Sequence, residues 1–300
     1  MNLIVGGTGA LGSAVAKRLL TAGESVRVMT RTPEKAASLA ADGAEVVRGD
    51  LLDRASLVRA CQGADGVVAA AHSIFGRGQA SSTRVDGHGH RELIDVATSA
   101  GVRHFVYTSA YHHGPQYNAV PFFRIKYEVE AHLKASGLGY TILRPTAFME
   151  SHAHMLIGES ILRNGKTVLF GRGEQPRNFV AADDVAGIAV RALSDPALAR
   201  QTVAVGGPEN LTNMDVVRLY EHASGRAAKV THVPLGMLRM VWRLMRPVHP
   251  GLSQVIQAGI LADTTDQRFD ARSQQERFGV ELTRLADWMP NRIRRPASAG

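Results

Sequence analysis

A glycine-rich turn near the start of the chain constrains the fold more than any other feature. The apolar run Asn2–Val5 leads directly into Gly6–Gly12, which reads GGTGALG, and helical spacing of leucine and valine continues to Thr21. Glycines at these positions allow a tight turn, a close approach of the backbone to a pyrophosphate and close packing of helix on strand. The helix N-terminus then offers free N–H groups to phosphate oxygens. A strand, a turn and a helix in this order predict a dinucleotide-binding βαβ unit.

The first half of the chain alternates short β-rich runs with helical patterns, which is typical of a parallel sheet built from βαβ units. Strands are expected at 2–5, 25–29, 44–48, 66–71, 104–108 and 140–143, and helices at 9–21, 33–41, 53–62, 83–99 and 122–136. After Pro145 the alternation weakens, and the pattern predicts strands at 202–205 and 230–233 and helices at 183–193, capped by Asp183, and at 212–223.

We therefore expect an α/β fold, a Rossmann-type doubly wound parallel sheet with a smaller C-terminal α/β substrate-binding portion. The expected division is a nucleotide-binding domain at 1–150 and a substrate or lid portion at 151–300 packed on it. Parts of 179–205 should return to the core, and 291–300 should form a flexible basic tail. Ligands of open parallel sheets bind at the carboxyl ends of the strands, so we expect a cleft there, between the two parts.

The end of the second expected strand indicates which dinucleotide is bound. An NAD site usually carries an acidic residue about 20 residues beyond the glycine turn, where it binds the ribose 2′-hydroxyl. Here Thr30 and Arg31 stand at that place, and Lys35 follows one helical turn later. A guanidinium can hold a 2′-phosphate through two hydrogen bonds, so the sequence favours NADP(H). The alternative is that Arg31 is a solvated residue at a strand end.

Composition limits the compartment and the partners. The single cysteine, Cys61, excludes an intrachain disulfide and favours a reducing compartment, so we expect a cytoplasmic protein. The N-terminus has no basic run and no apolar segment approaches about 20 residues, so we expect neither a signal peptide nor a membrane span. The net charge of +8 comes without a nucleic-acid-binding motif, so we expect a basic surface and no nucleic-acid partner.

Several further segments resemble the NmrA-like, atypical branch of the short-chain dehydrogenase/reductase superfamily. They are GGTGALG at 6–12, TRTPEK at 30–35, RGDLLD at 48–53, GVRHFVYTSA at 101–110, KYEVEAHLKASGLGYTILRP at 126–145 and FVAADDVAGIAV at 179–190. The resemblance covers the first 150 residues best and fades beyond about residue 230. It is specific for the family and not for one activity.

The resemblance implies roles for residues beyond the glycine turn. Asp50 and Leu51 would flank the adenine, and the loop Ala71–Ser73 would pass the ribose and pyrophosphate. Lys126 would reach the nicotinamide ribose hydroxyls, although it could also be a solvated helical residue, and Asp50 could instead cap the turn into the next helix. With the turn and strand end, the predicted cofactor contacts are Gly6, Gly7, Thr8, Gly9, Ala10, Leu11, Gly12, Thr30, Arg31, Asp50, Leu51, Ala71, His72, Lys126, Pro145 and Phe148.

The chain departs from the superfamily at the tyrosine of its Tyr-x-x-x-Lys pair. Phe122 stands four residues before Lys126 and has no proton to donate, while Tyr127 should point elsewhere on the helix. Ser109 fills the usual serine position. Hydride transfer remains feasible for an acceptor that is already electrophilic. The predicted catalytic residues are therefore Lys126, Tyr111 and His113, with His112 as a further proton donor, although histidines in a surface loop commonly have no such role.

The C-terminal sequence bears on the substrate. Leu235–Met245 combines apolar residues with arginines, and we interpret it as a helix that covers the substrate cleft, with a membrane-surface helix as the alternative. A small apolar or aromatic substrate is expected. The pairs His88/His90 and His152/His154 are spaced by two, which separates side chains on a helix, so we expect no metal site.

The sequence favours an NADPH-dependent reductase acting on an activated, fairly apolar acceptor such as a quinone or an enone. Two non-catalytic alternatives remain open because the superfamily's tyrosine is absent. One is an NADP(H)-sensing regulatory protein, a role known in the NmrA-like family, and the other is an accessory protein that holds NADPH structurally. The sequence leaves the oligomeric state open, with a homodimer as one arrangement.

Overall fold

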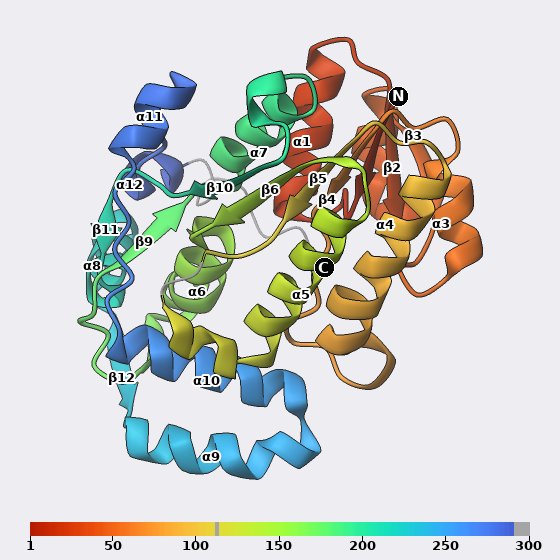
Figure 1. Cartoon of the computed structure of the whole chain (residues 1–300). Coiled ribbons are helices and arrows are strands. Elements are labelled where there is room, and N and C mark those ends of the chain that lie inside the picture. Colours follow the sequence, from red (N-terminus) through yellow and green to blue (C-terminus); the bar gives the residue numbers. More distant parts are fainter. Residues whose placement is uncertain (112–113, 291–300) are drawn as a thin grey trace.

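A seven-stranded, wholly parallel sheet forms the centre of the computed structural model, which describes residues 1–111 and 114–290 (Figure 1). The strand order is β10-β6-β5-β4-β1-β2-β3, and every neighbouring pair runs parallel. The strands are β1 (Asn2–Val5), β2 (Val26–Thr30), β3 (Glu45–Arg48), β4 (Gly66–Ala69), β5 (His104–Thr108), β6 (Gly139–Pro145) and β10 (Gln201–Val205). The order reverses between β1 and β4, which makes their carboxyl ends the position where open α/β sheets bind ligands.

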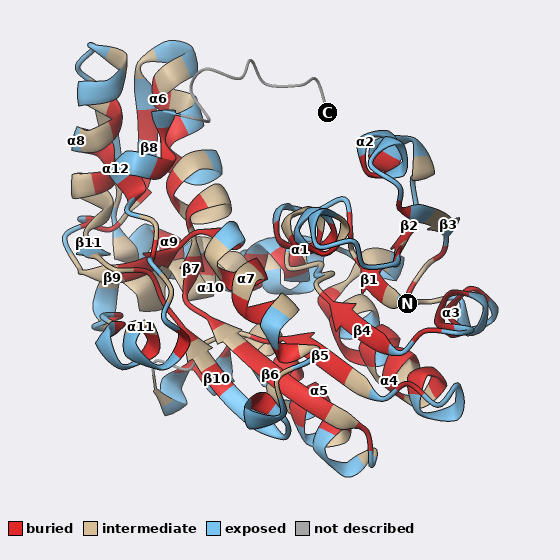
Figure 2. Cartoon of the chain, turned by 90° about the horizontal axis from the view of Figure 1, so that it is seen from above, coloured by how far each residue is buried: buried red, intermediate tan, exposed pale blue. Residues whose placement is uncertain are grey.

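Helices cover both faces of this sheet, because successive side chains of each strand point to opposite faces. On β1, Ile4 packs with α1 (Ala10–Thr21) and α7 (Ala182–Ala192), whereas Leu3 and Val5 belong to the core on the other face. That second core is closed by α3 (Arg54–Cys61), α4 (His90–Ser99) and α5 (Pro121–Ala135). The central strands are accordingly buried almost throughout (Figure 2). The fold is the Rossmann-type doubly wound sheet expected from the sequence.

The C-terminal part builds a third apolar core beside the sheet. Its strands are β7 (Ala147–Phe148), β9 (Arg177–Val180) and β11 (Asn210–Leu211) in one sheet, and β8 (Lys166–Phe170) with β12 (Lys229–Val233) in another. Its helices are η5 (Met149–Gly158), α6 (Glu159–Asn164), α8 (Asn213–Ser224), α9 (Leu235–Val248), α10 (Pro250–Thr264), α11 (Arg272–Phe278) and α12 (Leu285–Trp288). Since α7 and β10 lie on the main sheet, the chain passes between the two parts more than once. The domain boundary at residue 150 stays a prediction.

The structure differs locally from the sequence-based expectations. The expected helix at 33–41 begins as a 3₁₀ helix, η1 (Pro33–Ala36), before α2 (Ala37–Ala41), and the helix at 83–99 begins as a π-helix, η3 (Thr83–Gly89), before α4. The assignment of Asp183 as an N-cap is wrong. Ala181 is the N-cap residue of α7, the Ala182 N–H donates to the Glu150 carboxylate from η5, and Asp183 instead binds Arg18 on α1. Within the described part of the chain, no helix is long and apolar enough to cross a bilayer.

Candidate nucleotide-binding and active site

The glycine turn lies at the switch point of the sheet. Gly6 follows β1 with a φ of +85°, a conformation that favours glycine. Its neighbour across the sheet is Ala71, just beyond β4: a Cβ on Gly6 would lie 2.7 Å from the Ala71 nitrogen. The predicted contacts Gly6 and Ala71 are therefore brought together, and the turn closes by a bond from the Gly9 N–H to the Gly6 carbonyl, at 3.0 Å.

The four glycines of the turn are needed for different reasons. A Cβ on Gly7 would lie 2.5 Å from Val28, and one on Gly12 would lie 2.3 Å from the Gly6 carbonyl oxygen, so folding alone demands glycine at both positions. Gly9 is different. Its φ of −80° suits any residue, and its Cβ would meet only the Gly6 oxygen, at 3.4 Å. Packing within the protein therefore does not explain why residue 9 is a glycine. A ligand that approaches the backbone closely at this position would require one.

The N-terminus of α1 is open to an anion. Thr8, Gly9 and Ala10 are exposed, whereas Leu11 and Gly12 are buried beneath them. The N-cap residue is Gly9, and no side chain of residues 1–111 and 114–290 caps this end; the first turn carries no acidic residue. The first N–H groups of a helix have no partner within the helix, and they carry the positive end of its dipole. The end of α1 can therefore receive phosphate oxygens.

The carboxyl end of β2 presents Arg31 beside this turn. Thr30 is buried, and its hydroxyl accepts from the Thr32 N–H at 3.2 Å, which fixes the bend after the strand. Arg31 is exposed and makes no salt bridge within residues 1–111 and 114–290, in contrast to Arg48, which pairs with Glu34 at 3.5 Å. An uncommitted guanidinium at this position suits a phosphate on the 2′-oxygen of a ribose.

Asp50 and Leu51 follow β3 and have structural roles of their own. The Asp50 carboxylate accepts from the Leu52 N–H at 2.9 Å, and Ser56 binds the Asp50 backbone, so the residue shapes the turn into α3. Leu51 is buried, and Gly89 lies so close that a Cβ there would approach it to 2.8 Å. The role considered for Asp50 in the turn into α3 is therefore confirmed, while Asp53 is the N-cap of that helix and accepts from the Ala55 N–H at 3.0 Å. Contact of Asp50 or Leu51 with an adenine stays a prediction.

The loop after β4 is held by a buried carboxylate that the sequence did not single out. Asp86, on η3, accepts from the Ser73 N–H with both oxygens at 3.1 Å and from the Ser82 hydroxyl at 2.7 Å. His72 directly precedes Ser73 and is exposed. Asp86 thus fixes the backbone on which His72 is presented beside Ala71.

Lys126 is the most unusual group of the site, because its ammonium is buried without a direct salt bridge among the described residues. The Nζ donates to the Thr108 carbonyl at 3.0 Å and lies 4.9 Å from the centre of the Tyr107 ring and 5.7 Å from that of Phe122. Burial lowers the Lys126 pKa, while the carboxylates of Asp86 and Glu130 raise it. The reading of Lys126 as a solvated residue is wrong. One of its three N–H donors is engaged, which leaves two for a ligand.

Ser109 has a different partner from the one that the superfamily pattern suggests. Its hydroxyl donates to the buried Glu130 carboxylate at 2.5 Å, and Arg144 binds the same carboxylate through two bonds of 2.9 and 2.5 Å. The Arg144 guanidinium also lies 5.3 Å from the Tyr127 ring. Ser109 therefore belongs to a structural network beneath the site. Sequence reasoning missed Glu130 and Arg144, although the spacing of four from Lys126 places Glu130 on the same helix face.

The remaining predicted residues lie around the ends of β5 and β6. Pro145 ends β6, is buried, and accepts from the Tyr111 N–H at 2.9 Å, while Phe148 is half-buried in β7. The Tyr111 ring packs edge-on against Phe269, with centres 5.2 Å apart. His113, like His112, lies outside the described residues. The catalytic assignments of Tyr111 and His113 stay predictions.

One further cation is placed where no sequence pattern indicated it. The buried Nε of Arg177, on β9, has no hydrogen-bond partner in the described part of the chain, and the guanidinium lies 5.2 Å from the centre of the Phe179 ring. Burial lowers the Arg177 pKa to about 10. Arg177 also lowers the pKa of His152, which burial, as the larger cause, depresses to about 3.

The expectation that Leu235–Met245 covers a cleft at the sheet edge is wrong. This segment lies in α9, which packs on α10 at the outer edge of the molecule and leaves Met237 and Met240 exposed (Figure 1). It is α10 that reaches the loops after the strands. Gln254 donates to the Ile74 carbonyl at 2.6 Å and Gln257 to the Ala119 carbonyl at 3.2 Å.

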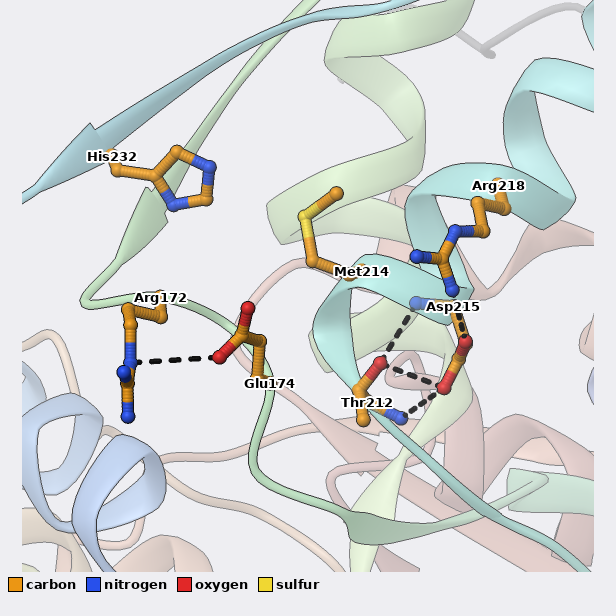
Figure 3. A pocket seen from close by; sticks show the side chains of 7 residues that line it. All are labelled: Arg172, Glu174, Thr212, Met214, Asp215, Arg218 and His232. Carbon is orange, nitrogen blue, oxygen red and sulfur yellow. Dashed lines mark hydrogen bonds and ion pairs between the residues drawn. The ribbon is translucent and has the colours of Figure 1, made fainter.

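A hollow of about 300 Å³ lies elsewhere, in the C-terminal part (Figure 3). Its charged side chains are satisfied among themselves: Arg172 pairs with Glu174 at 3.5 Å, and Arg218 binds Asp215, which also forms the capping box of α8 with Thr212. Each of the two arginines that line the hollow is therefore paired with a carboxylate of the same lining. Among the described residues, no group of histidine, cysteine and acidic side chains could hold a metal ion.

The residues at the sheet edge fit a dinucleotide. Gly9 leaves room beside the uncapped end of α1, Arg31 has no carboxylate partner within the described ranges, and Lys126 keeps two donors beyond the Thr108 carbonyl. The glycine turn and Arg31 follow β1 and β2, and Lys126, on α5, binds the last residue of β5. All three therefore lie at the carboxyl ends of the strands, where one extended molecule could contact them together.

Several known proteins are similar to this chain in sequence over most of its length. The photosystem II assembly factor Ycf39 of Synechocystis is 30% identical over 93% of this chain and 85% of its own. An NAD(P)H azoreductase of Xenophilus azovorans is 29% identical over 78% of each chain. A (4-alkanoyl-5-oxo-2,5-dihydrofuran-3-yl)methyl phosphate reductase of Streptomyces griseus is 30% identical over 96% of each.

Solved structures share the fold. The NADPH complex of an NADPH-dependent quinone oxidoreductase from Escherichia coli superposes with a TM-score of 0.74 at 23% identity, covering 98% of this chain and 100% of the other. The NADP(H) complex of a Citrobacter triphenylmethane reductase gives a TM-score of 0.76 at 20% identity, covering 97% and 99%. The sequence profile of the NmrA-like family matches residues 2–275, and the chain belongs to that family.

Proposed function

We propose that the chain is an NADPH-dependent reductase that transfers hydride to an activated, fairly apolar acceptor such as a quinone or an enone. The observation that carries the proposal is Lys126, which is held by the Thr108 carbonyl at 3.0 Å with two donors to spare, above Phe122, which can give no proton. A site that orients a nicotinamide but lacks the phenol donor suits acceptors that take hydride without simultaneous proton donation. Relatives named as reductases of azo compounds and of an unsaturated lactone phosphate support this class.

Different residues of the chain would bind and orient different parts of NADPH. The end of α1 receives the pyrophosphate, Arg31 the 2′-phosphate, and Lys126 the nicotinamide ribose hydroxyls, while Pro145 and Phe148 line the nicotinamide. NADPH supplies the hydride when bound. Tyr111 and His113 stand after β5 as the candidate donors of any proton that the reduced acceptor then takes up.

The test is NADPH oxidation by the purified protein against quinones, enones, azo dyes and imines. In Lys126→Met, NADPH affinity and turnover should fall together, because the lysine positions the cofactor. In Tyr111→Phe and His113→Gln, turnover should fall while NADPH affinity is unchanged. Turnover that survives the loss of all three side chains would support the reductase activity and contradict the assignment of these residues to it. If no acceptor is reduced, the proposal is wrong.

A second candidate is a non-catalytic NADP(H)-sensing protein. Two observations favour it: Phe122 replaces the proton donor, and the Ser109 hydroxyl is occupied by Glu130 at 2.5 Å. The relative named as an assembly factor adds support. A sensor would consume no NADPH, yet NADPH would change its affinity for a protein partner, and the partner would change the affinity for NADPH by the same factor. Measuring both affinities separates the sensor from the reductase.

A further inference from the structure

The outer face of α9 presents a continuous apolar stripe to solvent. Met237, Met240, Leu244 and Val248 are 51%, 58%, 60% and 67% exposed, and their spacing of three and four places them along one side of the helix. The opposite side holds the helix in place: Leu238 is buried and Trp242 half-buried, and the Ser253 hydroxyl of α10 donates to the Trp242 carbonyl at 3.3 Å. The exposed stripe therefore has no role in attaching α9 to the molecule.

Basic residues accompany the stripe. Arg239, Arg243 and Arg246 are exposed on the same helix, and none of them makes a salt bridge within the described residues. At 3.6 residues per turn, Arg243 lies about 60° from Met240 at the margin of the stripe, and Arg239 and Arg246 follow further round the helix. Between Glu221 and Asp263 the chain contains no aspartate or glutamate at all. Helix α9 thus carries three cations and no carboxylate, and the one carboxylate of α10, Asp263 near its C-terminus, is bound by the N–H groups of Arg172 and Gly173.

The apolar surface extends beyond α9 towards the loop after β4. Leu252, at the start of α10, is 37% exposed and Phe75 is 48% exposed. The backbones of the two segments are in contact at Gly251, since a Cβ there would lie 2.6 Å from the Phe75 carbonyl oxygen. We call Met237, Met240, Leu244, Val248, Leu252 and Phe75, with the three arginines, the α9 face. It lies next to the loop that carries His72.

We propose that the α9 face docks the protein on the surface of an anionic lipid bilayer. Exposed apolar side chains on one sector of a helix, with arginines beside them, are the composition of an interfacial helix that sinks its apolar residues to the acyl boundary and keeps its cations at the phosphates. Each arginine near an anionic surface adds attraction. The proposal concerns where the protein resides and is independent of the proposed reductase activity.

Charge argues against a second copy of the chain as the occupant. A two-fold dimer through this face would oppose the same patch on both subunits, and the three arginines of one copy would meet those of the other with no carboxylate between them. Such a juxtaposition of like charges is unfavourable. A bilayer rich in phosphate headgroups supplies the opposite charge and an apolar interior together.

The test is flotation of the purified full chain with vesicles. Vesicles of phosphatidylglycerol and phosphatidylcholine in equal amounts should carry the protein, vesicles of phosphatidylcholine alone should carry much less, and salt should weaken the binding. Arg239→Gln, Arg243→Gln and Arg246→Gln should each lower the partition coefficient about fivefold. Met240→Gln combined with Leu244→Gln should lower it at least about tenfold.

Val58→Gln combined with Arg59→Gln is the matched control, because Val58 and Arg59 are an exposed apolar and an exposed basic residue on α3, away from this face. It should bind vesicles like the native protein. All variants should keep the native circular dichroism spectrum and NADPH affinity, which separates loss of docking from loss of folding. Native protein that does not float with anionic vesicles, or α9 variants that float unchanged, would overturn the proposal. So would a native dimer that the α9 substitutions convert to monomers, because the face would then be an interface between copies.

Discussion

At the scale of single residues, the glycine turn separates the demands of folding from those of binding. Position 6 requires glycine because its φ is positive. Positions 7 and 12 require glycine because a Cβ would collide with Val28 and with the Gly6 carbonyl, respectively. Gly9 has an ordinary backbone conformation and room for a side chain. The motif recognised in the sequence therefore contains one position whose identity the fold itself does not explain.

Gly9→Val should fold like the native protein and fail to bind NADPH, because the branched side chain would occupy the space of the pyrophosphate. We expect the melting temperature to change by no more than about 2 °C and the Kd for NADPH to rise at least about 100-fold, or about 2.7 kcal/mol. Calorimetric titration and thermal unfolding measure both. Gly12→Val is the contrasting variant and should fail to fold stably, since its Cβ would meet the Gly6 oxygen at 2.3 Å. Native NADPH affinity in folded Gly9→Val would place the cofactor elsewhere.

Arg31 should determine the choice between the two dinucleotides. NADPH is expected to bind at least about tenfold more tightly than NADH, which corresponds to about 1.4 kcal/mol. Arg31→Ala should remove most of that difference by weakening NADPH alone, because only NADPH carries the 2′-phosphate. Arg59→Ala, an exposed arginine on α3, serves as the control and should leave both affinities unchanged. Equal affinities of the native protein for NADPH and NADH would contradict the assignment.

At the scale of elements, α5 combines the site with its support. Phe122, Lys126 and Glu130 are spaced by four and share one helix face, which places the ammonium above one ring and next to a buried ion pair. The sequence pattern predicted the helix and Lys126. It could not predict the partner of Glu130, because Arg144 comes from β6 and only the packing of α5 against the sheet brings them together.

Glu130→Gln should destabilise the protein by roughly 3–5 kcal/mol, because the half-buried Arg144 would lose its carboxylate and Ser109 its acceptor. Glu128→Gln is the matched control on the same helix. Its carboxylate is exposed and 3.6 Å from Arg124, so its loss should change stability by less than about 0.5 kcal/mol. Urea unfolding of both variants gives the comparison. Similar losses for the two would show that the Ser109–Glu130–Arg144 network contributes no particular stability.

Elements were predictable where pattern and length were strong. The six sheet strands of the first half and their helices follow from buried apolar runs and helical periodicity, and their ends were placed to within about two residues. The short strands β7, β9 and β11 were missed, as was β8. The first three have two to four residues each, too few for a periodic pattern, and all four pair across long stretches of chain, as Asn210 does with Asn178.

At the scale of the whole molecule, the site places basic groups in the interior, and this links stability to pH. His90 is fully buried, its Nδ1 lies 3.1 Å from the Val85 carbonyl oxygen, and its ring packs edge-on against Tyr107. Burial, and then the charge of Lys126, lower the His90 pKa from 6.5 to about 4. Burial also lowers the pKa of His152 to about 3.

The folded protein should therefore lose stability in acid. Below about pH 6.5 His90 is protonated in the unfolded chain but stays neutral in the folded protein. The contribution of His90 to the free energy of unfolding is therefore fully present above pH 6.5 and is lost as the pH falls to about 4. This one residue accounts for about 3 kcal/mol over that window. His90→Gln should be less sensitive to pH by that amount in urea unfolding, and His88→Gln, which changes an exposed histidine, should behave like the native protein. Identical pH profiles for the native and His90→Gln proteins would contradict the assignment.

The position of β10 has a consequence for how the protein is made. β6 ends at Pro145, but its outer neighbour in the sheet is Gln201–Val205, which pairs with it along its length. While the ribosome adds the intervening stretch, at about 5–20 residues per second, the nascent chain holds a sheet that lacks β10, and β6 is an unpaired edge strand in addition to β3. During synthesis β6 can therefore pair with another chain for several seconds. A ribosome that pauses between the codons of these two strands would lengthen that exposure and increase the dependence on chaperones.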